Sequence, residues 1–223
     1  MPVLPVAAYK SQARYDLEQA RIFSRTWACA GFVEEITEPG HYLAVQAGLN
    51  GISIVMGEDR KLRAFHNICR HRGAQLLRTA GKTRKVIVCP YHDWTYDLEG
   101  KPHVIPDRRR AFAGVDLDDL DLKPAAFARW RGMLCVHPSA AAAPVADWFG
   151  AIEPHLGPHR VNRLPKDPDA RSERLIAANW KIDAAALSRY IHNHSQSHKS
   201  LKSQFRQPPQ PIPPDDPSAL LSD

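Results

Sequence analysis

The chain of 223 residues lacks any apolar run that approaches the roughly 18 residues needed to cross a bilayer. Its first ten residues also lack the charged start and apolar centre of a signal peptide. Cysteine is scarce, with only Cys29, Cys69, Cys89 and Cys135. We therefore expect a cytoplasmic protein with no membrane association, whose reduced thiols serve in packing, catalysis or metal binding.

The chain also lacks a strong excess of positive or negative charge. It has 30 basic and 24 acidic residues, which give a formal net charge of +6. The basic residues are scattered, and the densest runs, such as Arg108 to Arg110, are short. We therefore expect no nucleic-acid interface. A weakly basic surface suits an acidic protein partner, such as a small electron carrier.

Short apolar segments separated by turns fill residues 28–138. The expected strands lie at 38–45, 85–90, 94–103 and 131–138, with two more in 51–67 around the polar turn at Glu58 to Arg60. Helical spacing of apolar residues predicts helices at 15–27, 143–156 and 182–194, with a strand at 172–181. The expected fold is mainly β with flanking helices, and its main part is a small antiparallel β-domain.

Two short stretches, "CRHRGA" at 69–74 and "CPYHDW" at 89–94, each combine one thiol with one imidazole. Cys69 and His71 are separated from Cys89 and His92 by seventeen residues, and each pair follows an expected strand. Two adjacent hairpin tips would bring all four ligands to one point. Two thiolates on one iron and two imidazoles on the other define a Rieske [2Fe–2S] centre. A Cys2His2 zinc site is the alternative, although zinc usually takes like ligands in pairs.

The segments "FHNICRHRGAQLL" and "CPYHDWTYDLEGKP" closely resemble the cluster-binding loops of the Rieske non-haem iron oxygenases. These are the alpha subunits of aromatic-ring-hydroxylating dioxygenases and of related monooxygenases that act on choline, betaine and similar compounds. The resemblance extends over residues 15 to about 192 through "RIFSRTWACAGFVEEITEPGHYL", "RGMLCVHPSA" and "AANWKI". It implies an antiparallel Rieske β-domain followed by an α+β catalytic domain, which is incomplete here.

The resemblance further implies an oxidoreductase that receives electrons from an NAD(P)H-dependent reductase or ferredoxin. These electrons pass through the [2Fe–2S] cluster to a mononuclear Fe(II) that activates O2. Family oxygenases are homotrimers or α3β3 assemblies. The domains expected on this basis are an N-terminal helical segment (1–38), the Rieske domain (39–140), a remnant of the catalytic domain (141–203) and a disordered proline-rich tail (204–223).

The residues around the ligands have expected roles as well. In the family the arginine-rich first loop helps to pack the two loops together, so Arg70 and Arg72 either do this or are simply solvated. Tyr91 and Trp94 are expected to shield the cluster from water, a role that overlaps with ordinary core packing.

The remaining cysteines and two histidines carry no ligand pattern. Cys29 and Cys135 lie in apolar strand contexts, so we expect both to be buried structural residues. We expect no ligand role for His66 and His103.

The mononuclear iron site fits the chain poorly. When the family pattern is laid on "AANWKI" without gaps, Arg189 replaces the acidic residue that bridges subunits, and Ala185-Ala186 replace a glutamate-asparagine pair. The first iron-binding histidine falls on His192, and the second falls on Ser197, one position before His198.

His194 and His198 are spaced to share a helix face, with Asp215 or Asp216 as a conceivable third ligand. The change of composition near this point suggests a gene fragment or a reading-frame change.

Three functions follow from these patterns. The favoured one is an oxygenase alpha subunit with a complete cluster domain and an incomplete Fe(II) site. The second is a stand-alone Rieske ferredoxin-like electron carrier, which would hold about two irons per chain rather than about three. The third is an interaction protein in which a metal serves only for stability.

Overall fold

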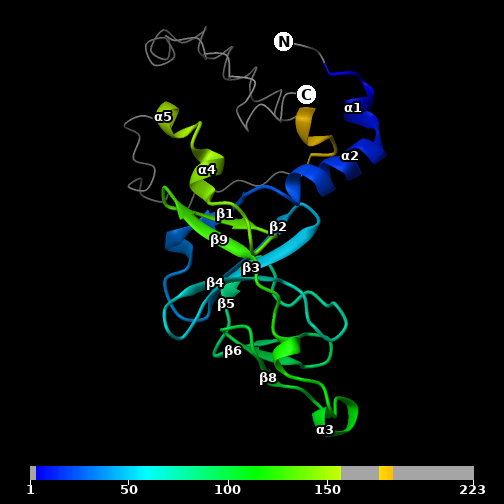
Figure 1. Ribbon diagram of the computed structural model, residues 1–223, viewed down its shortest axis with the longest axis vertical. Helices are drawn as coiled ribbons and strands as arrows, with labels where there is room; N and C mark the ends of the chain where they lie inside the picture. Colours follow the sequence, from blue (N-terminus) through cyan, green and yellow to red (C-terminus); the bar gives the residue numbers. More distant parts are fainter. Residues whose placement is uncertain (1–3, 157–175, 183–223) are drawn as a thin grey trace. The chain divides into compact units, whose positions relative to one another are not determined.

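The computed structural model describes residues 4–156 and 176–182 (Figure 1). The contacts within the chain divide it into two units, residues 17–164 and residues 1–16 with 165–223, which are described separately. No helix of the described residues is long and apolar enough to span a membrane.

The 17–164 unit is built from three antiparallel sheets. The largest has the order β4-β3-β2-β5, and its strands are β2 (His41–Ala47), β3 (Asn50–Met56), β4 (Leu62–His66) and β5 (Ala80–Lys82). A second sheet, β1-β10-β9, contains β1 (Ala28–Phe32), β9 (Ala126–Trp130) and β10 (Met133–His137). The third, β6-β7-β8, contains β6 (Val86–Val88), β7 (Thr95–Asp97) and β8 (Pro102–Val104). The expected mainly β, antiparallel architecture is confirmed.

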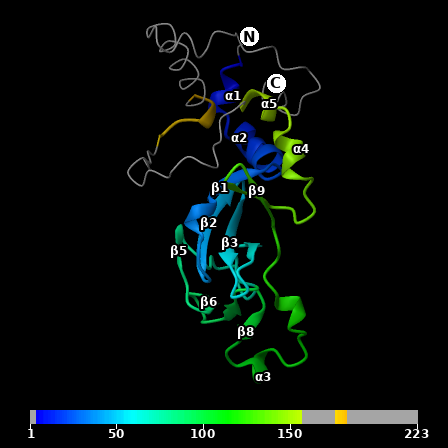
Figure 2. The same ribbon diagram turned by 90° about the vertical axis from the view of Figure 1, so that its left-hand side faces the viewer.

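Two apolar cores hold these sheets together, and in both views the four-stranded sheet lies between the other two (Figures 1 and 2). One core joins β2, β3 and β4 to β10 through residues such as Ile52, Ile54 and Leu134, none of which is exposed. The other surrounds β6 and β7 and includes Ile87, Tyr96, Cys69 and Cys89. The two thiols of the predicted cluster site are therefore part of an apolar core.

The polar turn expected at Glu58 to Arg60 joins β3 to β4. The Arg60 N–H donates to the Gly57 carbonyl over 3.0 Å, and Arg60 adopts a left-handed conformation with φ of 59°. The register pairs Met56 with Leu62 across the hairpin, and Ile52, Ile54 and Met56 of β3 lie in the core shared with β10, whereas Val55 lies in the other core. This prediction from sequence is confirmed.

The helices are shorter than the sequence predicts. α1 (Ala7–Lys10) precedes α2 (Gln12–Glu18), which continues as the π-helix Gln19–Phe23, so residues 24–27 of the expected helix are not helical. The helix expected at 143–156 is divided into α4 (Val145–Phe149) and α5 (Glu153–Leu156). Pro154 explains this division, because proline fits the first turn of a helix but breaks its interior. The described residues also form α3 (Arg108–Ala111) and the 3-10 turns Val33–Glu35 and Asp118–Leu120.

The strand expected at 172–181 is wrong for the part that the structure describes. Residues 176–179 form no strand, and residues 180–182 are helical. The Lys181 N–H donates to Asn179 Oδ1 over 3.1 Å, and the Ile182 N–H donates to the Asn179 carbonyl over 2.9 Å. Asparagine at this position caps a helix N-terminus, so the helix begins before the expected residue 182.

Gly100 closes the turn between β7 and β8 in a conformation that requires glycine. Its φ is +89°, and an added Cβ would lie 2.5 Å from Phe65 Cε1 in the core. Gly114 has a similar φ of +87° but open space around it. We expect Gly100→Ala to lower the free energy of unfolding by about 2–4 kcal/mol and Gly114→Ala by only about 1 kcal/mol, as measured by urea unfolding. Equal losses would contradict this packing role.

Candidate metal centre

The first predicted ligand loop is a tight turn that begins at Cys69, just after β4. The Cys69 N–H donates to the Ala74 carbonyl over 2.8 Å, and the Gly73 N–H donates back to the Cys69 carbonyl over 3.0 Å. Gly73 has a φ of +73°, which glycine adopts without steric cost. This turn leaves His71 at its tip.

The second loop, between β6 and β7, repeats this turn. The Cys89 N–H donates to the Trp94 carbonyl over 2.8 Å, and the Asp93 N–H donates to the Cys89 carbonyl over 3.1 Å. Asp93 takes the place of the glycine and has a φ of 55°, a conformation that aspartate tolerates better than most residues. The six-residue stretches "CRHRGA" and "CPYHDW" therefore form equivalent turns, with an imidazole at the third and the fourth position respectively.

The two cysteines of these turns are buried, with exposed fractions of 3% for Cys69 and 1% for Cys89. The Tyr96 hydroxyl on β7 lies 3.4 Å from Cys69 Sγ and accepts the Arg70 N–H over 3.0 Å, so it connects the second hairpin to the first loop. Burial raises the pKa of the Cys69 thiol, and the neighbouring Cys89 raises it further, whereas the Tyr96 contact opposes them. A bound cation would favour the thiolates in this apolar site.

The two imidazoles lie together, with 4.7 Å between the ring centroids of His71 and His92. The His71 ring stacks on Trp94 at 4.9 Å with an interplanar angle of 6°. Burial lowers the pKa of His71, and the nearby His92 and Arg72 lower it further, which favours the neutral imidazole that binds metals. His71 Nδ1 is buried without a hydrogen-bond partner. An unpartnered buried nitrogen is what a missing metal ligand bond would leave behind.

Two thiols and two imidazoles from equivalent loops fit a cluster with two irons. Within residues 4–156 and 176–182, no three Cys, His, Asp or Glu side chains converge as ligands of one metal ion. A Rieske cluster does not need such convergence, because each of its irons takes only two protein ligands.

Aromatic side chains cover the site unevenly. Trp94 is 2% exposed, whereas Tyr91 is 60% exposed although its ring lies 4.0 Å from that of His92. Phe112, which follows α3, contacts both His71 and Trp94 with centroid distances of 6.0 and 5.1 Å. Trp94 therefore has the shielding position expected of it, while Tyr91 is largely in solvent. The sequence analysis missed Phe112 and Tyr96, and only the i, i+2 spacing from Trp94, just before β7, to Tyr96 on β7 could have pointed to the tyrosine.

The arginines of the first loop differ in their surroundings. Arg70 is half-buried, and its Nη2 donates to the Asp119 carbonyl over 3.2 Å, which fastens the loop to the 3-10 turn at Asp118–Leu120. Arg72 is exposed, and its guanidinium lies 5.8 Å from the centroid of the Tyr91 ring. The Arg70 side chain therefore contacts the 3-10 turn and not the second loop, so it does not show the expected packing between the loops, and the contact with the second loop comes from the exposed Arg72.

The other titratable residues singled out from the sequence lie elsewhere. His66 Nε2 lies 2.9 Å from the Pro138 carbonyl, and His103 on β8 is exposed. Cys135 is buried as expected, but Cys29 is exposed, because β1 is an edge strand of its sheet. The expectation that both cysteines are buried is therefore wrong for Cys29. The candidate iron ligands His192 and His198 lie outside the described residues.

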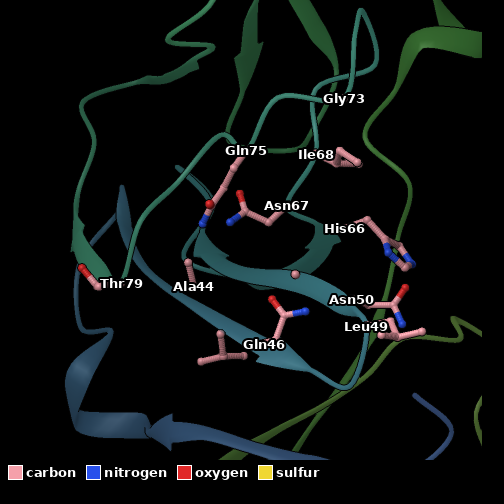
Figure 3. Close-up of a pocket in the computed structure, with 12 residues that line it drawn as sticks. Ala44, Gln46, Leu49, Asn50, His66, Asn67, Ile68, Gly73, Gln75 and Thr79 are labelled. Carbon is pink, nitrogen blue, oxygen red and sulfur yellow. The ribbon is translucent and has the colours of Figure 1, made fainter. Parts of the chain in front are cut away.

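A depression of about 480 Å³ adjoins the first loop, but none of the four predicted ligands lines it (Figure 3). The Asn67 side chain in its wall is tied to the backbone of Leu77, because it donates to the Leu77 carbonyl over 2.7 Å and accepts the Leu77 N–H over 2.9 Å. Gln46 Nε2 donates to the Gly48 carbonyl over 2.9 Å. These amides serve the fold, and the chemistry-bearing residues lie in the two loops instead.

The fold and these two loops define a class of protein. Residues 26–122 match the family of the Rieske [2Fe–2S] domain. The chain therefore contains a Rieske [2Fe–2S] domain.

Relatives specify the class further. The chain is 37% identical over 186 residues to the glycine betaine monooxygenase oxygenase subunit of Chromohalobacter salexigens, covering 80% of this chain and 39% of the relative. It is 31% identical to the carnitine monooxygenase oxygenase subunit of Escherichia coli K12, covering 80% of this chain and 47% of the relative. It is 29% identical to the biphenyl dioxygenase alpha subunit of Metapseudomonas furukawaii, covering 86% and 44% respectively.

Solved structures agree with these relatives. The quaternary ammonium Rieske monooxygenase CntA in complex with gamma-butyrobetaine has a TM-score of 0.71 and 29% identity, covering 80% of this chain and 51% of that one. The chain is thus homologous to the alpha subunits of Rieske oxygenases. It spans about half the length, or less, of the relatives named here.

Proposed function

We propose that Cys69, His71, Cys89 and His92 hold a Rieske [2Fe–2S] cluster and that the chain is the electron-receiving part of an oxygenase alpha subunit. The observation that carries this proposal is the pair of equivalent turns at 69–74 and 89–94. Each turn supplies one buried thiol and one imidazole, and the two imidazoles, His71 and His92, lie next to each other. Cys69 and Cys89 would bind one iron, and His71 and His92 the other.

The residues around the ligands determine how such a site works. A bound cluster of this type accepts and passes on single electrons. Trp94 stacks on His71 and keeps water from one face of the imidazole pair. The Tyr96 hydroxyl is placed to donate a hydrogen bond to the Cys69 sulfur, which favours the more negative, reduced state. The histidine pair is half-buried, so it is the edge at which a redox partner approaches most closely.

The proposed electron source is an NAD(P)H-dependent reductase or a ferredoxin, and the proposed destination is a mononuclear Fe(II). Inter-subunit electron transfer is described for a homologous quaternary ammonium Rieske monooxygenase. A homotrimer or an α3β3 assembly would provide the same route here. In this proposal residues 39–140 form the Rieske domain, 141–203 correspond to the start of a catalytic domain, and 204–223 form a proline-rich tail.

The proposed Fe(II) site is incomplete within this chain. Arg189 replaces the acidic residue of the family pattern, and a guanidinium repels a divalent cation instead of binding it. Of the candidate ligands, only His192 and His198 lie near the expected positions, and the carboxylate of the usual facial triad would have to come from Asp215 or Asp216 in the proline-rich tail.

An iron and acid-labile sulfide count on the purified chain tests this proposal. We expect about two irons and two sulfides per chain, because one complete cluster site accounts for all four ligands. About three irons would show that the Fe(II) site is complete after all. A protein with zinc and no labile sulfide would contradict the cluster assignment and support a purely structural metal.

A further inference from the structure

Cys29 and Cys135 form a second pair of thiols, separate from the cluster loops. Cys29 on β1 is the register partner of Cys135 on β10 in the antiparallel sheet β1-β10-β9. Directly opposed residues in antiparallel strands have Cα atoms about 4.5 or 5.5 Å apart. Both values lie within the range of about 4.4–6.8 Å that a disulfide requires.

The two thiols also lie on the same face of this sheet. Leu134 and Val136, which flank Cys135, are part of the core shared with the four-stranded sheet, and Ala28 and Ala30, which flank Cys29, pack against that core. Because successive side chains of a strand point to opposite faces, Cys29 and Cys135 project together from the other face. A bulge follows Cys29 in the register, and Cys29 Sγ lies 3.9 Å from the Gly31 carbonyl on its own strand.

The pair combines an accessible thiol with a protected one. Cys29 is exposed on the edge strand, whereas Cys135 has no exposed surface. Burial raises the pKa of the Cys135 thiol to about 11, and the neighbouring Cys29 contributes to this shift. An external oxidant therefore reaches Cys29 first. The buried Cys135 does not meet the oxidant, but it lies close enough to Cys29 to act as the second, resolving thiol.

We propose that Cys29 and Cys135 are a dithiol modification site, which low-molecular-weight disulfides such as glutathione disulfide convert reversibly into a cross-strand disulfide. The Cys29 thiolate attacks one sulfur of glutathione disulfide, forms a mixed disulfide and releases the first glutathione. Cys135 attacks Cys29 Sγ, and its proton passes to the sulfur of the second glutathione, which leaves as a thiol. The two protein thiols lose two electrons and two protons in total, and one glutathione disulfide becomes two glutathione thiols.

This site differs from the cluster in its position and its chemistry. Cys69 and Cys89 lie in the core around β6 and β7, whereas Cys29 and Cys135 lie on the far side of the other core. A disulfide here joins the edge strand β1 covalently to β10 and leaves both ligand loops unchanged. The inference does not depend on whether the cluster is bound.

The test uses the full chain with its native metal content, treated with glutathione disulfide, quenched with an alkylating agent, digested and mapped by mass spectrometry. We expect one peptide pair joined through Cys29 and Cys135, the loss of two alkylatable thiols and full reversal by dithiothreitol. The visible spectrum recorded before and after treatment reports separately on the cluster loops.

Two variants distinguish a dithiol from two independent cysteines. In Cys135→Ser, the first step has no resolving thiol, so glutathione remains attached to Cys29. In Cys29→Ser, Cys135 remains free because it is buried. A wild-type chain that keeps glutathione on Cys29 with Cys135 still free would overturn the proposal, as would a chain in which neither cysteine reacts.

Discussion

Replacing His71 with alanine is expected to abolish the electron-spin-resonance signal of the reduced protein, a signal with a low average g value. The His71 ring is held between Trp94 and His92, and its Nδ1 has no hydrogen-bond partner. Among the described residues, no group of three Cys, His, Asp or Glu side chains converges here that could supply a replacement ligand. Iron content should fall at least about tenfold, since even residues that only support a ligand cost 10- to 100-fold in metal affinity. Spin quantitation and iron analysis on the same sample measure both effects.

His103→Ala is the matched control. His103 lies on β8 of the same small sheet, but it is exposed and has no place in either loop. Its variant should retain the full signal and iron content. A normal spectrum in the His71 variant, or equal losses in both variants, would contradict the assignment of His71 as a ligand.

Replacing Tyr96 with phenylalanine is expected to lower the reduction potential of the cluster. The Tyr96 hydroxyl lies 3.4 Å from Cys69 Sγ, and burial raises the pKa of Tyr96, so the hydroxyl stays protonated and can donate to a thiolate. Reduction adds negative charge to the cluster, so this hydrogen bond favours the reduced state. Losing about 1 kcal/mol of this preference corresponds to a shift on the order of 50 mV in a one-electron couple.

Tyr42→Phe provides the control for this measurement. Tyr42 on β2 packs against the same apolar core as Tyr96, but its hydroxyl lies next to Gly81 on β5, where a Cβ added to that glycine would be 2.7 Å away. Redox titration followed by visible absorption should give the wild-type potential for Tyr42→Phe and a lower one for Tyr96→Phe. An unchanged or higher potential in the Tyr96 variant would show that its hydroxyl does not stabilise the reduced cluster.

Local sequence patterns were sufficient for the parts of the fold that local interactions determine. The hairpin of β3 and β4 was predictable because two apolar segments flank a single polar turn, and such a turn sets the register of the pair. The four predicted ligands were identifiable because each pair lies within a single tight turn. The equivalence of the two turns was not, since it depends on Asp93 adopting the left-handed conformation that Gly73 adopts easily.

Interactions between distant segments explain what the sequence analysis missed. Phe112 reaches His71 across 41 positions of the chain, and nothing in the residues around Phe112 marks that contact. The exposure of Cys29 follows from the position of β1 at the edge of its sheet, which the apolar segment "TWACAGF" does not reveal. Asn179 was included in an expected strand, because its capping role depends on where the next helix begins.

Pulsed electron spin resonance of the reduced protein, prepared with natural and with ¹⁵N-labelled histidine, tests the central claim most directly. If the two loops hold two irons through two sulfurs and two imidazoles, the spectrum should show couplings to two histidine nitrogens. Both couplings should change when the histidine is labelled with ¹⁵N. A reduced cluster without histidine nitrogen couplings would contradict this account, whatever its iron content.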